Sequence, residues 1–118
     1  MRKAASGLVM AALGLMLAIG GVGRALAQGA PRTHSVIMEN MKFTPSTVEI
    51  SPGDRVTFKN RDLVPHTATT KGTSSSAFDS GVVKPGESWT VTPQSGEAIR
   101  YGCIFHPTME GVIIVTHH

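Results

Sequence analysis

Apolar and polar residues alternate with a period of two along most of the chain beyond its N-terminal segment. Val56 and Phe58 alternate with polar neighbours, and Trp89 and Val91 do the same further along. Successive side chains on a β-strand point to opposite faces of a sheet, so each such segment can bury one face and expose the other. No longer stretch of this part has a helical repeat, and the pattern therefore predicts an all-β domain.

Turn-forming pairs of residues separate the alternating segments and set their length. The expected strands are 34–39, a segment ending at 48–50, and then 55–59, 88–92, 99–103 and 112–115. The pairs that punctuate them are Pro52-Gly53, Ser80-Gly81, Pro85-Gly86 and Ser95-Gly96. Short strands with regular turns predict a β-sandwich or a small barrel. Tyr101 favours a Greek-key sandwich if its hydroxyl bonds across a corner, and a plain core aromatic is the alternative.

The N-terminal segment has the features of an export signal. Arg2 and Lys3 precede an apolar run over residues 4–23, and Ala25-Leu26-Ala27 provides a small-residue cleavage site. This order predicts a secretory signal peptide at 1–27, with an uncleaved membrane anchor as the alternative. Residues 28–118 then form one small exported domain, which we expect in the periplasm and free of the membrane.

The basic charge of the whole chain belongs to this signal segment. The chain has 11 Lys and Arg against 8 Asp and Glu, and Arg2, Lys3 and Arg24 lie in the signal, which leaves 8 against 8. A formally neutral domain without a basic run gives no reason to expect nucleic acid as a partner.

The chain has a single cysteine, which cannot form a disulfide within the chain. Cys103 is followed by His106 and Met109 in a C-x2-H-x2-M spacing, and Pro107 is expected to turn the chain before Gly111 lets it re-enter a strand. Such a short loop can bring three side chains to one point. Small exported domains often need a stabiliser besides their core, and a bound metal is a candidate.

A fourth donor has to come from elsewhere, and His66 in the Pro-His pair after the 55–59 strand is the candidate. Two imidazoles and a thiolate with a weak axial thioether are typical of a blue-copper electron-transfer site. The alternatives are a zinc site, a nucleophilic Cys–His pair and an inert buried cysteine. Zinc disfavours thioether ligands, and no Asn or Asp near either segment suggests a catalytic third group.

With these residues the chain resembles the cupredoxins, and most closely amicyanin and its plastocyanin-like relatives. The stretches that carry the resemblance are "MKFTPSTVEISPGDRVTFKNRDLVPHT" and "YGCIFHPTMEGVIIV". The resemblance implies a cupredoxin-like Greek-key β-sandwich of about 7–8 strands. It also implies one copper ion held by His66, Cys103, His106 and Met109, and electron shuttling in the periplasm.

Three residues beside the expected ligands differ from amicyanin. Thr67 stands where that family has an asparagine that braces the cysteine loop, so we expect weaker support there. Phe105 replaces a proline and Thr108 a phenylalanine. Groups around metal ligands tune the metal, so Thr67, Phe105 and Pro107 are the expected neighbours that do so.

The resemblance further implies that His106 is the exposed ligand through which electrons pass. We expect Pro65, Pro107 and Met41 to form an apolar patch around it for brief docking of a redox donor or acceptor, with the protein acting as a monomer. Ordinary strand-end packing is the alternative for Met41. Redox encounters use small interfaces of this kind.

Two functions follow, a mobile electron carrier and, as the alternative, a protein for copper storage, delivery or tolerance. The second would need extra metal sites, for which His34, Met38 and Met41, or His117 and His118, are candidates; packing on a strand face is the simpler explanation for His34 and Met38. We do not expect an enzyme, because four protein ligands leave no open position for a substrate.

Overall fold

The computed structural model describes residues 29–94 and 97–116, so the predicted signal segment 1–27, the predicted turn at Ser95-Gly96 and the pair His117–His118 lie outside the described residues. Residues Pro31–His118 form one compact unit. Its strands are β1 (Thr33–Glu39), β2 (Lys42–Thr44), β3 (Thr47–Ile50), β4 (Arg55–Asn60), β5 (Thr69–Thr70), β6 (Ser88–Val91), β7 (Ala98–Cys103) and β8 (His106–Val115). Within the described ranges, no helix is long and apolar enough to cross a membrane.

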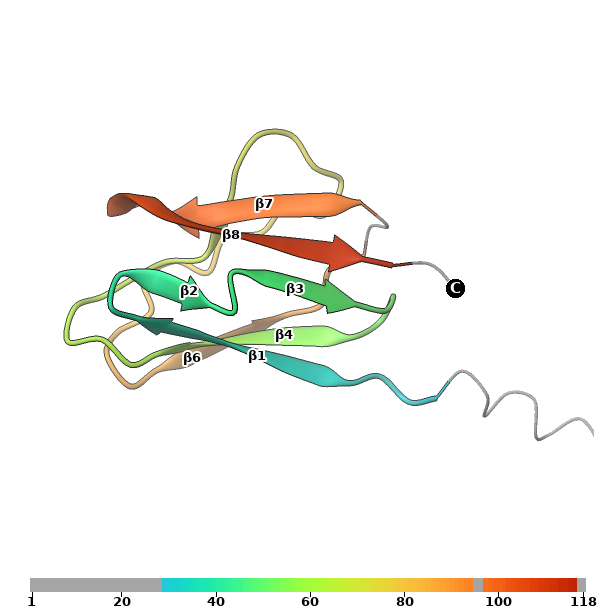
Figure 1. The fold of residues 1–118 in the computed structure, drawn as a ribbon, viewed down its shortest axis with the longest axis horizontal. Helices are drawn as coiled ribbons and strands as arrows, with labels where there is room; N and C mark the ends of the chain where they lie inside the picture. Colours follow the sequence, from blue (N-terminus) through green and yellow to red (C-terminus); the bar gives the residue numbers. More distant parts are fainter. Residues whose placement is uncertain (1–28, 95–96, 117–118) are drawn as a thin grey trace, which may run out of the picture. The chain divides into compact units, whose positions relative to one another are not determined.

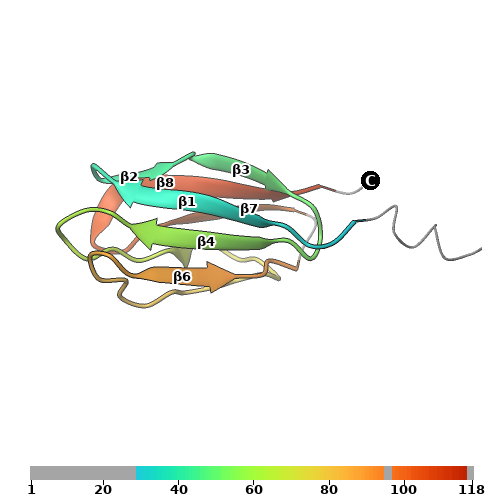
Figure 2. The ribbon, with the colours of Figure 1, turned by 90° about the horizontal axis from the view of Figure 1, so that it is seen from below.

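Two four-stranded sheets pack face to face (Figures 1 and 2). One has the strand order β2-β1-β4-β6, and the other has the order β3-β8-β7-β5. Because non-consecutive strands lie side by side in both sheets, the chain crosses between them repeatedly. The prediction of an all-β sandwich of about 7–8 strands is confirmed, since the described residues form eight strands in two sheets.

Both sheets contain a parallel pair of strands, β1 with β4 and β3 with β8. β1 runs parallel to β4 from the pair Thr33 and Arg55 to the pair Met38 and Asn60. The residues that follow the two strands therefore leave the sheet at the same end. The N–H of Arg61 continues the contact by donating to the carbonyl of Met38 at 2.9 Å.

The core between the sheets is rich in aromatic rings. Tyr101 is fully buried, and its ring centroid lies 4.7 Å from that of Phe43 and 5.2 Å from that of Phe58. Burial raises the pKa of its hydroxyl, which has no hydrogen-bond partner among the described residues. The expectation of a hydrogen bond across a corner is therefore wrong, and the alternative of a core aromatic holds.

The chain after Cys103 differs from the expected loop. Only Ile104 and Phe105 separate β7 from β8, so Pro107 lies inside a strand and forms no turn. Proline fits there because β3 pairs with β8 only from Val112 onward, which leaves the first half of β8 with one open edge. Gly111 also lies within β8, where an added Cβ would meet the Tyr101 hydroxyl, so the ring requires a glycine.

Candidate metal centre

His66 is held rigidly although it lies outside the regular strands. Its N–H donates to the Val83 carbonyl at 3.1 Å, and the Val83 N–H donates back to the His66 carbonyl at 2.8 Å. The side-chain amide of the buried Asn60 donates to the carbonyls of Val64 and Val83, at 2.8 and 2.9 Å. These bonds fix the segment after β4, and His66 itself is fully buried. The amide of Asn60 was not anticipated from the sequence.

The two sheets bring the predicted donors of this end together. Cys103 ends β7 and His106 begins β8, and their Cα atoms pair across the two-residue turn. One ligand atom from each of His66, Cys103 and His106 can be chosen so that all three lie within 4.8 Å of one another. Cys103 is buried and His106 is half-buried, so the cluster lies at the edge of the core.

The donor separations suit one shared metal ion. The Nδ1 atom of His66 lies 3.7 Å from the Sγ atom of Cys103. Two donors bound at about 2.0 and 2.3 Å, as imidazole nitrogen and thiolate sulfur are on zinc, come to such a separation around one ion. The two imidazole rings of His66 and His106 lie 5.0 Å apart between centroids. The donor types, two imidazoles and a thiolate, suit copper.

Thr67 supports the cysteine from behind. Its N–H donates to the Cys103 Sγ at 3.3 Å, and its hydroxyl accepts a bond from the Ile104 N–H at 3.0 Å. A third contact, 2.9 Å long, joins the hydroxyls of Thr67 and Thr69. The short side chain of Thr67 therefore reaches the residue that follows the cysteine, although we had expected weaker support at this position.

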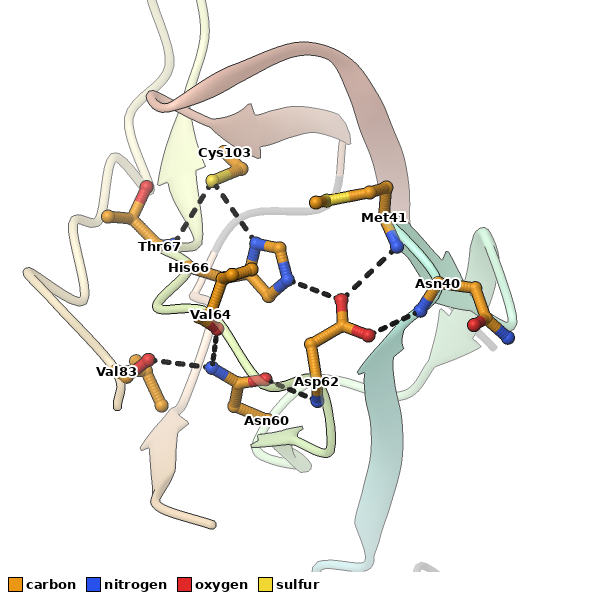
Figure 3. Close-up of polar contacts among 9 residues, drawn as sticks. All are labelled: Asn40, Met41, Asn60, Asp62, Val64, His66, Thr67, Val83 and Cys103. Atoms are coloured by element: carbon orange, nitrogen blue, oxygen red, sulfur yellow. Dashed lines mark hydrogen bonds and ion pairs between the residues drawn. The ribbon is translucent and has the colours of Figure 1, made fainter. Parts of the chain in front are cut away.

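Asp62 completes the surroundings of His66 (Figure 3), so the expectation that no Asp near this segment orients a histidine is wrong. Its Oδ2 lies 2.6 Å from the Nε2 atom of His66 and accepts a bond from the Met41 N–H at 3.2 Å. Its Oδ1 accepts a bond from the Asn40 N–H at 2.7 Å. Desolvation by burial raises the pKa of Asp62, but the bonds from His66, Asn40 and Met41 outweigh it and leave this pKa below its usual value.

The remaining predicted site residues differ in how far they are buried. Met109 is buried at 1% exposure in β8, three residues after His106. Phe105 is 46% exposed, with its ring centroid 6.5 Å from that of His106. Pro65 and Pro107 are exposed, and Met41 is 44% exposed, so strand-end packing does not bury it.

Two of the other candidate metal residues, Met38 and His34, have different surroundings among the described residues. Met38 is fully buried in the core, and His34 bonds to Asp54 with 2.9 Å between Nε2 and Oδ2. Among the residues that the structure describes, His66, Cys103 and His106 form the one group of three or more His, Cys, Asp or Glu donors close enough to share an ion. The candidates His117 and His118 lie outside these residues.

Comparison with known structures supports the fold. A purple cupredoxin from Nitrosopumilus maritimus is 24% identical with a TM-score of 0.64, and the match covers 70% of this chain and 99% of that one. A proline-to-phenylalanine variant of amicyanin in its reduced state is 26% identical with a TM-score of 0.65, covering 70% of this chain and 81% of that one.

A Cu-containing nitrite reductase from Thermus scotoductus also matches, with 26% identity and a TM-score of 0.68. That match covers 75% of this chain but only 23% of the reductase, so most of the enzyme has no counterpart here.

Comparison of the sequence with curated proteins found no match. The sequence profile of the family described as copper binding proteins, plastocyanin/azurin family, matches residues 32–116. This range contains both sheets and all three clustered donors, and copper is the metal that the family binds. The chain therefore belongs to the plastocyanin/azurin family of copper-binding proteins.

Proposed function

We propose that this protein is a periplasmic carrier of single electrons. The observation that carries the proposal is the convergence of His66, Cys103 and His106 within 4.8 Å, with two of the three residues buried. Copper bound there supplies a centre that alternates between Cu(I) and Cu(II) and so holds or releases one electron.

The protein's part is to keep the donors in one arrangement for both oxidation states. The Thr67 N–H holds the Cys103 sulfur, and paired backbone bonds to Val83 hold His66. A donor set that does not need to move between states makes electron transfer less demanding, because little rearrangement accompanies the change of charge. The two-residue turn fixes the spacing of Cys103 and His106 in the same way.

Met109 is proposed as the residue that would supply the fourth ligand. Its side chain is as buried as the core residues, and its thioether is a soft donor that suits Cu(I). With Met109 in place the protein itself supplies four donors. We therefore propose no substrate position and no catalytic role.

The half-buried His106 is proposed as the point where electrons enter and leave, with apolar side chains as the docking surface. Exposed apolar residues flank the ligands in the sequence on both segments: Leu63, Val64 and Pro65 before His66, and Ile104, Phe105 and Pro107 beside His106. Met41 is also exposed, on the connection between β1 and β2. An uncharged, apolar patch suits short-lived contacts with a redox donor or acceptor, since such interfaces are small. The monomeric state and the periplasmic location, the latter from the signal segment at 1–27, belong to the same proposal.

Copper addition tests the function directly. Residues 28–118 are purified without metal and titrated with Cu(II), and visible and EPR spectra are recorded. We expect one equivalent of copper, an intense thiolate-to-copper band, and reversible one-electron cycling. The Cys103→Ser variant serves as the control and should lack the band.

The same titration separates the carrier from the copper-handling alternative. Binding of several Cu(I) ions that pass readily to a chelator would favour storage or delivery. A colourless protein that prefers zinc would contradict both functions.

A further inference from the structure

The two nitrogens of the His66 ring have different neighbours. Nδ1 lies 3.7 Å from the Cys103 sulfur, on the side of the metal centre. Nε2 lies 2.6 Å from Oδ2 of Asp62, on the side away from it. His66 is completely buried, so water does not compete for either nitrogen. The ring is therefore placed between a thiol and a carboxylate (Figure 3).

This arrangement decides which nitrogen carries the proton. Both oxygens of Asp62 accept backbone N–H bonds, Oδ1 from Asn40 and Oδ2 from Met41. A carboxylate used in this way can only accept, so the proton of a neutral His66 lies on Nε2. The lone pair of Nδ1 is then free on the side where Cys103 lies, which is the tautomer that a metal ligand needs.

The Asp62 carboxylate is held by the connection between β1 and β2, which is distant from it in the sequence. Asn40 and Met41 form the connection between β1 and β2, and both are non-glycine residues with positive φ, 57° and 58°. Asparagine tolerates this left-handed conformation, whereas it is unfavourable for methionine. In this conformation the N–H groups of both residues donate to the Asp62 carboxylate. The N–H of Asp62 also donates to Oδ1 of Asn60 at 2.8 Å.

We propose that Asp62 is a positioning residue that sets the tautomer and direction of His66 and stabilises Cu(II) relative to Cu(I) at this centre. The inference rests on the proposed function, because it assigns a role at the same copper site. A carboxylate that accepts the Nε2 proton makes the imidazole a more basic ligand, and its negative charge favours the more highly charged metal ion. Asp62 therefore lowers the reduction potential.

A purely structural role is the competing explanation. Asp62 could serve only to hold the Asn40–Met41 turn against the segment after β4. That role predicts a loss of stability when Asp62 is replaced, but no change in the preference of the site for one copper oxidation state. The two explanations therefore differ in the ratio of Cu(II) to Cu(I) affinity, which a loss of stability alone would not change.

The test measures the affinities for Cu(II) and Cu(I) separately, by competition with chelators, and the reduction potential by titration. The variants are Asp62→Asn, which keeps the shape but removes the charge, and Asp62→Ala, which removes both. The Asp54→Asn variant is the matched control, because Asp54 bonds to His34 and to two backbone N–H groups away from the donors.

We expect Asp62→Ala to lose Cu(II) affinity by about 10–100-fold, the range typical for outer partners of metal ligands, and to lose much less Cu(I) affinity. Each tenfold fall in the Cu(II) affinity relative to the Cu(I) affinity raises the reduction potential by about 59 mV, the value for a one-electron couple. Asp62→Asn should lie between Asp62→Ala and the unaltered protein, Asp62→Glu should recover part of the effect, and Asp54→Asn should match the unaltered protein.

Two results would overturn the inference, and they differ from each other. If Asp62→Asn and Asp62→Ala keep the unaltered affinity ratio and potential while their metal-free forms lose stability, Asp62 serves only to hold the turn. If the unaltered protein shows no thiolate-to-copper band, the proposed function fails and this inference fails with it.

Discussion

Among the residues that the structure describes, two histidine–aspartate pairs lie one at each end of β4, in different surroundings. Asp54 precedes β4 and bonds to His34, whereas Asp62 follows β4 and contacts His66. The separations are similar, 2.9 Å in the first pair and 2.6 Å in the second. The residue types and the distances alone do not separate a structural pair from one at a metal centre.

The two aspartates also accept the same kinds of bonds. Asp54 accepts the N–H groups of Arg32 and Ser51, at 2.9 and 3.1 Å. Asp62 likewise accepts two backbone N–H groups, from the connection between β1 and β2. Because β1 and β4 are parallel, the segments before the two strands lie at one end and the segments after them at the other. Asp54 bonds across the first end and Asp62 across the second.

The difference lies in the histidine. The His34 side chain is 28% exposed, whereas that of His66 is 0% exposed and has the Cys103 sulfur beside its second nitrogen. A carboxylate that bonds to one ring nitrogen fixes the orientation of the imidazole, and with it the direction in which the other nitrogen points. At His34 the bond joins the start of β1 to the segment before β4, whereas at His66 it orients a residue proposed as a copper ligand.

The largest contrast should appear when each histidine is replaced. We expect His66→Ala to lose Cu(II) affinity by more than the roughly 100-fold limit of outer-partner changes, because a direct ligand is removed. His34→Ala should bind copper as the unaltered protein does. Chelator competition measures both, and equal losses in the two variants would mean that copper binding depends only on overall folding.

The stability of the metal-free protein should respond to Asp54. Asp54→Ala removes the acceptor for Arg32, Ser51 and His34, and an unsatisfied buried donor destabilises a protein by about 1–3 kcal/mol. Urea unfolding followed by tryptophan fluorescence, from Trp89, gives this free energy. Copper affinity should stay unchanged, and a parallel loss of copper binding would break the separation between the two pairs.

Acid should weaken the metal-free protein through the same residue. The N–H of Arg32, the bond from His34 and the N–H of Ser51 lower the pKa of Asp54 from 3.8 to about 2. A folded-state pKa below that of the unfolded chain contributes stability that is complete above 3.8 and is lost as the pH falls through about 2.

Urea unfolding between pH 5 and pH 2 measures this loss, and Asp54→Asn should show a shallower decline over the range 3.8 to about 2. An equally steep decline in that variant would assign the acid sensitivity to other carboxylates.

The smallest effect should come from the turn that holds Asp62. Met41 is 44% exposed with φ at 58°, so little packing is lost in Met41→Gly while the unfavourable backbone conformation is relieved. We expect the free energy of unfolding to rise by up to about 1 kcal/mol. The Met41→Ala variant keeps the strain and should not be stabilised, so a gain in that variant would contradict the explanation.

Much of the fold could be predicted from local pattern. Val56 and Phe58, and Ile99 and Tyr101, alternate as expected and are buried. Trp89 and Val91 are partly buried against the same core. The short strands β2 and β5 were not expected, since three and two residues are too few to show an alternation. The parallel pairing of β1 with β4 joins distant segments and has no local signal.

The site divides in the same way. Cys103, His106 and the Pro-His pair at His66 could be identified because residue type and spacing together indicate metal chemistry. Asp62 could not, because its contact with His66 depends on the turn at Asn40 and Met41, which the parallel strands bring beside it. A carboxylate in a loop has no pattern that marks such a contact.

The metal centre is assembled from two chain segments that can change independently in evolution. Cys103, His106 and Met109 lie in one short hairpin that could be grafted whole into a related sandwich. Such a graft would carry the clustered donors Cys103 and His106, the proposed donor Met109 and the exposed turn at Ile104 and Phe105, but it would leave Asp62 and its turn behind. Changes in the 103–109 hairpin could therefore alter the proposed docking surface of a descendant, and changes at Asp62 and its turn could alter the reduction potential.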